Sequence, residues 1–264
     1  MKNQILTKNQ MTIKNNQTIM SHLEELRWVF VRSIVYLIIA GLVSFFFAEQ
    51  IIELIKLPAK DVITNFFILK PTDSIVIYMK TIMYGAVVIA FLPMTYEFIN
   101  FVRPALQQEQ VLFVFKWTIF AVILFIAGTI FVYFAVLPIA IKFLIDLAQT
   151  LTSSSTQVSF NAYISFVLML LLCGGIIFQI PLICAMLTLL NIITPFVLRR
   201  FRKEIFFGLC VFSAIITPTT DIFSMLLFVF PMIILYELGI IISNVIYKQK
   251  KSEIDKIYDG GKYD

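Results

Sequence analysis

The amino-acid sequence predicts an all-α membrane protein with six transmembrane helices in a kinked, concave bundle. Hydrophobic residues make up 60% of its 264 positions and charged residues only 14%, and the mean hydropathy is +0.93. An ordinary soluble domain is about 45–50% apolar and about 25% charged. The apolar residues also gather in runs long enough to cross a hydrocarbon core of about 30 Å. Composition and run length together exclude a soluble globular domain.

The apolar runs lie between two polar tails, residues 1–20 and 248–264, and we expect the first tail to be mobile. The membrane domain between them, residues 21–247, has spans at about 28–48, 75–100, 111–137, 160–190, 204–217 and 222–247. The fifth run has roughly 14 residues, so it spans about 21 Å and falls short of the membrane core. Interfacial helices are predicted near residues 50–57 and 139–148.

Four prolines fall inside the predicted spans: Pro93, Pro138, Pro181 and Pro231. Each proline removes one helix hydrogen bond and bends the chain. Two interpretations stay open. The bends are generic kinks, or the four bent helices together form a curved wall that is open to lipid on one face.

Lysine and arginine set the predicted orientation. Fifteen of them lie in the tails and loops on the side that holds both termini, and four lie in the loops on the opposite side. Basic residues collect on the cytosolic side of membrane proteins. Both termini are therefore predicted to be cytosolic, or stromal in a plastid, and the net charge of +5 reflects topology rather than nucleic-acid binding.

No arrangement typical of an enzyme or of a metal or cofactor site is present in the sequence. The three cysteines all lie inside apolar runs without metal-ligand spacing, and His22 is the single histidine. An intramembrane enzyme therefore lacks support. A secondary transporter of a small solute stays open as an alternative, with Lys80, Gln179 and Glu237 lining a site near the midplane.

Ionisable and amide groups inside the spans are costly, so each needs a partner or a route to water. Arg32 and Lys80 lie near span ends, where long side chains can reach the interface. Glu237 is deeper, and Arg32 is the cation at the most similar depth, so we expect these two to pair. Gln179 is predicted to make an interhelical hydrogen bond or to serve function directly.

Two acidic positions flank the membrane on the basic side. In "SHLEELR", Ser21 and Glu24 fit a capping box, whereas Glu25 shares a helix face with Arg32. In "FINFVRPALQQEQ", Pro104 ends the second span and Glu109 opens the third. Glu109 suits a helix N-terminus, where it can also pair with Arg103, or it forms an exposed anionic site.

Five segments occur in order across the six spans: "SHLEELR", "FVRPALQQE", "GGIIFQIPLI", "ITPTTDIFS" and "FPMIILYELGI". Together they resemble TatC, the polytopic receptor subunit of the twin-arginine protein translocase, over roughly residues 20–247. The "TPTTD" form is closer to cyanobacterial and plastid members than to the "TPPD" of many bacterial ones.

The resemblance implies a receptor for signal peptides that carry two adjacent arginines, with Glu25 and Glu109 as the recognition acids and Phe101 and Pro104 beside them. It also implies assembly with TatA-type and TatB-type single-span subunits and with further copies of the chain, and transport of folded proteins driven by the proton-motive force. Four more polar residues are assigned to partner or intramembrane contacts: Arg27, Gln179, Asp221 and Glu237. The motif form favours a thylakoid membrane over a bacterial plasma or mitochondrial inner membrane.

Some positions depart from the family pattern. Gln179 stands where many members have a glutamate, and Gln110 replaces a commonly basic neighbour of Glu109. Glu97 is acidic where a glutamine is familiar, and Arg103 is an extra cation. Glu97 either adds a third carboxylate to the site or neutralises Arg103, and the sequence does not decide between these.

Overall fold

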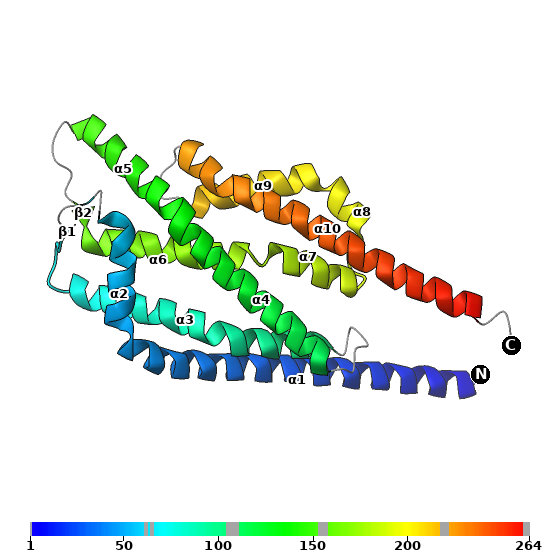
Figure 1. Ribbon diagram of the computed structural model, residues 1–264. Coiled ribbons are helices and arrows are strands. Elements are labelled where there is room, and N and C mark those ends of the chain that lie inside the picture. The colour runs from blue at the N-terminus through cyan, green and yellow to red at the C-terminus, as the bar shows by residue number, and fades with distance from the viewer. Residues whose placement is uncertain are drawn as a thin grey trace.

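The computed structural model describes residues 2–60, 63, 66–103, 111–152, 158–216 and 222–260, and almost all of these lie in helices (Figure 1). The long helices run back and forth along one axis as a bundle. The N-terminal part of α1, Lys2–Phe46, and the C-terminal part of α10, Ile222–Gly260, both extend beyond the same end of this bundle, which we call the terminal end. The all-α membrane class predicted from composition is confirmed.

Two long helices form one side of the bundle. Helix α1 covers Lys2–Phe46 and packs along α3, which covers Asp73–Val102. At 1.5 Å per residue, the 45 residues of α1 measure about 68 Å, far more than the membrane core. Only Glu24–Phe46 has the apolarity of a membrane span. The first part of α1 therefore continues outside the apolar layer, and it extends past the end of α3 (Figure 1).

The far end of the bundle carries short elements. Helix α2, Ala48–Lys56, is followed by a 3₁₀ turn at Leu57–Ala59 and packs across α3 and α6, the latter covering Phe160–Ile177. Strands β1, Phe66–Phe67, and β2, Val158–Ser159, form a two-residue parallel pair. Ile52 and Ile55 of α2 point into the core. The helix predicted near residues 50–57 is therefore present, and it closes the end opposite the termini.

Irregular helix turns lie next to two of the four prolines. Helix α4, Val111–Phe131, runs through a π-helical turn at Val132–Val136 into α5, Leu137–Thr152, whose second residue is Pro138. Helix α6, Phe160–Ile177, is separated from α7, Ile180–Leu189, by two residues before Pro181. The wide turn and the break accommodate the missing N–H groups.

The last three helices complete the bundle. Helix α8, Pro195–Arg200, is short, α9 covers Arg202–Ile216, and α10 covers Ile222–Gly260. Pro93 and Pro231 lie inside the continuous helices α3 and α10. Five helical stretches of the described chain are long and apolar enough to cross a membrane. Helix α9 has 15 residues, about 22 Å, so the count of six spans stays a prediction.

Glycines allow α4 and α6 to approach closely. A Cβ on Gly128 would lie 2.5 Å from the carbonyl oxygen of Gly174, and one on Gly175 would lie 2.5 Å from the ring of Phe125. Phe125 is itself 2% exposed and stacks on Phe91 of α3, with 4.1 Å between ring centroids. The small residues therefore let α3, α4 and α6 pack as one unit at the centre of the bundle.

Candidate functional site

Glu25 lies on α1 near the terminal end and its side chain is exposed. Helix α1 is continuous from Lys2, so Ser21 and Glu24 are not in its first turn and the predicted capping box is wrong. A capping box needs backbone N–H groups without helical partners, and these exist only at a helix start. The mobility of residues 1–20 stays a prediction.

Arg32, Tyr36 and Glu97 form a polar cluster between α1 and α3. Arg32 Nη1 donates to Glu97 Oε2 at 3.0 Å, and the Tyr36 hydroxyl donates to Glu97 Oε1 at 3.1 Å. Glu97 is 8% exposed, and two side chains of α1 donate to its two oxygens. Glu97 therefore pairs with Arg32 and not with Arg103, the cation that the sequence suggested for it.

The pairing of α1 with α3 places the end of α3 close to Glu25. Arg32 and Tyr36 meet Glu97, and further along, a Cβ on Gly41 would lie 3.8 Å from Ala86 Cβ. In antiparallel helices each step forward on one is a step back on the other. The last residues of α3 are therefore level with about Trp28, roughly one helical turn from Glu25.

The remaining predicted recognition residues lie in the last turn of α3 or follow it in the sequence. Phe101 is half-buried in the last turn of α3. Pro104 and Glu109 lie outside the described residues, and so does Asp221. Arg27 is exposed on α1, two residues after Glu25. A surface pocket of about 600 Å³ follows on α1, lined by Trp28, Val31, Arg32, Val35 and Tyr36.

Glu237 pairs with Arg202 and not with Arg32, so the predicted Arg32–Glu237 pair is wrong. Arg202 Nη2 donates to Glu237 Oε2 at 2.7 Å, joining the start of α9 to α10. Depth along a span identified Glu237 as a group that needs a cation. It did not show that α9 packs on α10 while α1 packs on α3.

Gln179 lies in the break between α6 and α7. Its Nε2 donates to the carbonyl oxygen of Ala121 on α4 at 3.1 Å and approaches that of Gly175 at 3.4 Å. The predicted interhelical hydrogen bond is confirmed. Its Oε1 is enclosed without a hydrogen-bond partner among the described residues.

Lys80 is held inside the bundle and does not simply reach the interface as expected. Its Nζ donates to Asn161 Oδ1 at 3.1 Å and to Ser165 Oγ at 2.6 Å, both on α6. The Asn161 amide in turn donates to Asp73 Oδ1 at 3.1 Å. No sequence motif singled out Asn161, although an asparagine at the start of an apolar run is a usable signal.

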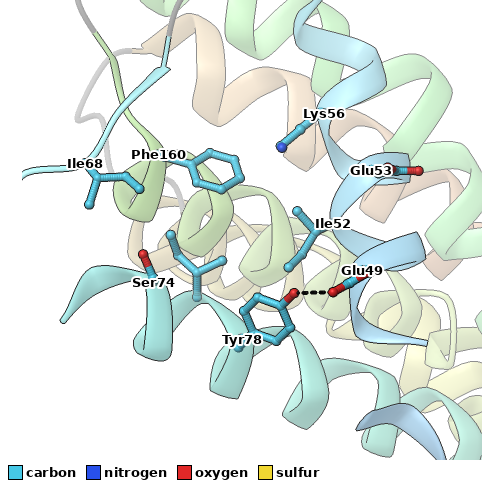
Figure 2. A pocket seen from close by; sticks show the side chains of 9 residues that line it. Glu49, Ile52, Glu53, Lys56, Ile68, Ser74, Tyr78 and Phe160 are labelled. Carbon is cyan, nitrogen blue, oxygen red and sulfur yellow. Dashed lines mark hydrogen bonds between the residues drawn. The ribbon is translucent and has the colours of Figure 1, made fainter. Parts of the chain in front are cut away.

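A pocket of about 280 Å³ lies at the far end between α2, α3 and α6 (Figure 2). The Tyr78 hydroxyl donates to Glu49 Oε1 at 2.9 Å on its rim, and Lys56 Nζ lies 4.8 Å from the centre of the Phe160 ring. Lys80, Gln179 and Glu237 do not line this pocket. Lys80 is bonded to α6, Gln179 to Ala121 of α4 and Glu237 to Arg202 of α9. These separate partners weaken the alternative of a shared midplane transport site.

In the part of the chain that the structure describes, no three His, Cys, Asp or Glu residues gather as possible metal ligands.

Comparison with known proteins decides the family. The profile of the family described as Sec-independent protein translocase protein (TatC) matches residues 21–231. The chain belongs to the TatC family. Its members are receptor subunits of a protein translocase and not enzymes.

Curated relatives agree over most of the chain. The TatC protein of Aquifex aeolicus is 34% identical over 241 residues, which cover 89% of this chain and 98% of the relative. An uncharacterized TatC-like protein, ycf43, of Gracilaria tenuistipitata var. liui is 30% identical over 232 residues, covering 88% and 95%. A crystal structure of the twin-arginine translocase receptor TatC aligns with a TM-score of 0.77 and 32% identity, covering 85% of this chain and 99% of that one.

Proposed function

We propose that this TatC-family chain binds twin-arginine signal peptides at its terminal end, through Glu25 and Glu109 with Phe101 and Pro104 beside them. The observation that carries the proposal is the pairing of α1 with α3. It brings the end of α3, which directly precedes Pro104 in the sequence, to within about one helical turn of Glu25 along the helix axis.

Carboxylates suit a ligand that presents two arginines. Each guanidinium forms planar, bidentate, charge-assisted bonds to one carboxylate, which a lysine ammonium cannot reproduce. Glu25 is exposed on α1, so the arginine of a ligand can reach its carboxylate. The apolar segment of a signal peptide fits the pocket on α1 beyond Trp28.

The wider assembly is part of the same proposal. The chain works with TatA-type and TatB-type single-span subunits and with further copies of itself, and the proton-motive force drives transport of folded cargo. Arg27, Gln179, Asp221 and Glu237 are proposed for partner or intramembrane contacts, with Glu237 acting through its bond to Arg202. Both termini are cytosolic or stromal. We assign the chain to a plastid thylakoid membrane rather than to a bacterial plasma or mitochondrial inner membrane, and the similarity to a ycf43 protein agrees with a plastid.

Site-directed crosslinking of a twin-arginine signal peptide to the full-length protein in membranes tests the site. We expect Glu25→Ala and Glu109→Ala each to lose at least about tenfold in crosslinking yield, because each removes one bidentate charge-assisted pair. Glu24→Ala is the matched control, since it removes a neighbouring charge that is also exposed. A signal with two lysines should crosslink weakly to every variant.

The site assignment is wrong if Glu25→Ala and Glu109→Ala crosslink like the parent protein. An equal loss in Glu24→Ala would show a general effect of surface charge. Uptake of a small solute by vesicles that contain this chain alone would favour the transporter alternative.

A further inference from the structure

The corner where α8 meets α9 presents cations that no acid of the described chain neutralises. Arg199 and Arg200 end α8, Lys203 lies in the first turn of α9, and all three side chains are exposed. Within the described residues none of them forms an ion pair, and the nearby exposed Glu204 forms none with them. Arg202 between them differs, because Glu237 holds it at 2.7 Å. The corner therefore has a net positive charge that faces outward.

Two consecutive residues of α10, Tyr236 and Glu237, hold this corner in place. The Tyr236 hydroxyl donates to the carbonyl oxygen of Leu198 at 2.8 Å, and Glu237 accepts from Arg202. Leu198 is 5% exposed and packs in a cluster with Cys184, Tyr236 and Ile240. The backbone on both sides of Arg199 and Arg200 is thus anchored. The cations project from a fixed platform.

Exposed aromatic side chains accompany the cations on the same helix faces. Phe196 is 74% exposed and lies three and four residues before Arg199 and Arg200, so it shares their face of α8. Phe207 is 73% exposed and lies four residues after Lys203 on α9. Both helices therefore combine an exposed phenyl ring with a positive charge.

We propose that this corner, defined by Phe196, Arg199, Arg200, Lys203 and Phe207, binds the phosphate headgroup of an anionic phospholipid. The guanidinium groups offer paired donors to phosphate oxygens, and basic clusters at the membrane surface attract anionic lipid. The phenyl rings lie where the acyl chains of the same lipid begin. A soluble phosphate would use the cations but would leave the two exposed rings without a partner.

The position of the corner in the molecule fits this occupant. It lies at the terminal end of the bundle (Figure 1), which the positive charge of the sequence assigns to the cytosolic or stromal leaflet. Helix α9 starts here and measures only about 22 Å, so it cannot reach across the apolar core without local thinning. A lipid headgroup bound at Lys203 would hold the start of this short helix at the level of the phosphates.

The test measures lipid selectivity of the full-length protein in phosphatidylcholine vesicles. The probes are spin-labelled phosphatidylglycerol and spin-labelled phosphatidylcholine, and the readout is the ratio of their association with the protein. The variant Arg199→Gln, Arg200→Gln, Lys203→Gln removes the corner charges. The matched control Lys60→Gln, Lys70→Gln, Lys142→Gln removes three exposed charges at the far end.

We expect the parent protein and the control to prefer phosphatidylglycerol, and the corner variant to lose about fivefold or more of that preference. Inorganic phosphate, compared with sodium chloride at equal ionic strength, should not displace the labelled lipid. Unchanged preference in the corner variant, or an equal loss in the control, would overturn the proposal. Displacement by phosphate would also overturn it, since the corner would then be a site for a soluble anion.

Thermal unfolding of each protein in detergent shows whether the variants are folded. If the triple variant does not fold, the single changes Arg199→Gln and Lys203→Gln replace it. Each is expected to lose part of the phosphatidylglycerol preference, and full preference in both would contradict the proposal. The measurement involves no signal peptide, so its outcome does not depend on the recognition site near Glu25.

Discussion

Glu97 accepts two hydrogen bonds across the α1–α3 contact, and its side chain is only 11% exposed. The guanidinium of Arg32 is half exposed, so water screens the pair on one side. A buried acceptor left without donors costs more than an exposed one, because no water replaces the lost bond. The same reasoning applies to Arg202 and Glu237, whose side chains are 43% and 37% exposed and whose pairing should contribute less.

Glu97→Ala should lower the stability of the protein by about 1 kcal/mol, because Arg32 and Tyr36 both lose their acceptor. Glu97→Gln should cost less, since the amide oxygen still accepts one hydrogen bond. The measurement is thermal unfolding of the purified protein in detergent.

Glu24→Ala provides the control for that experiment, because Glu24 is exposed on α1 and should change stability by no more than about 0.5 kcal/mol. The pair Arg32→Gln and Glu97→Gln should also show coupling in a double-mutant cycle. Additive effects would contradict the role that we give to the cluster.

At the scale of elements, two contacts between helices depend on the absence of a side chain. Gly128 and Gly175 let α4 and α6 approach until their backbones and the Phe125 ring nearly touch. Lipid tails are as apolar as the helix side chains, so burying those side chains between helices gains little hydrophobic free energy. Close packing is therefore a main source of helix association in a membrane. The break before Pro181 belongs to the same region, and Gln179 bridges it to α4.

Gly128→Ala should destabilise the protein by about 1–3 kcal/mol, because the new Cβ would lie 2.5 Å from the backbone oxygen of Gly174 and backbone cannot swing aside. Gly208→Ala is the matched control, since nothing lies within 4 Å of its Cβ and alanine favours the helix. Unfolding in detergent should therefore show opposite shifts for the two variants. Equal stability of both would mean that α4 and α6 do not pack as described.

At the scale of the whole molecule, both chain ends lie at one end of the bundle and α2 closes the other (Figure 1). Glu25, the end of α3 and the α8–α9 corner lie toward the terminal end, the side to which the sequence assigns most lysines and arginines. Signal recognition and anionic lipid binding are therefore proposed for the same membrane face. The far end instead carries the Glu49–Tyr78 pocket (Figure 2).

A topology measurement follows from this arrangement. On a background with Cys173, Cys184 and Cys210 changed to Ala, a cysteine replacing Lys248 should react with an impermeant maleimide from the cytosolic or stromal side. A cysteine replacing Lys60 should react only from the opposite side. The background without an added cysteine is the control. Labelling of both positions from one side would contradict the predicted orientation.

The sequence by itself determined the membrane class, the approximate helices and the family, because apolar run length and ordered motifs are local properties of the chain. It also identified Gln179 and Glu237 as groups that need partners, since an unpaired polar group in an apolar layer is costly. It misplaced the start of α1, because the "SHLEELR" pattern also suits the interior of a longer helix.

Only the tertiary structure decided which charge meets which. Glu97 and Glu237 lie 65 and 35 residues from the arginines that hold them, and no local pattern encodes such distances. Pairing follows from which helix packs on which, α1 on α3 and α9 on α10, and packing depends on the shapes of whole faces. The same packing leaves Arg199, Arg200 and Lys203 exposed and pairs Arg202 with Glu237. A count of charges in the sequence does not tell these four neighbouring cations apart.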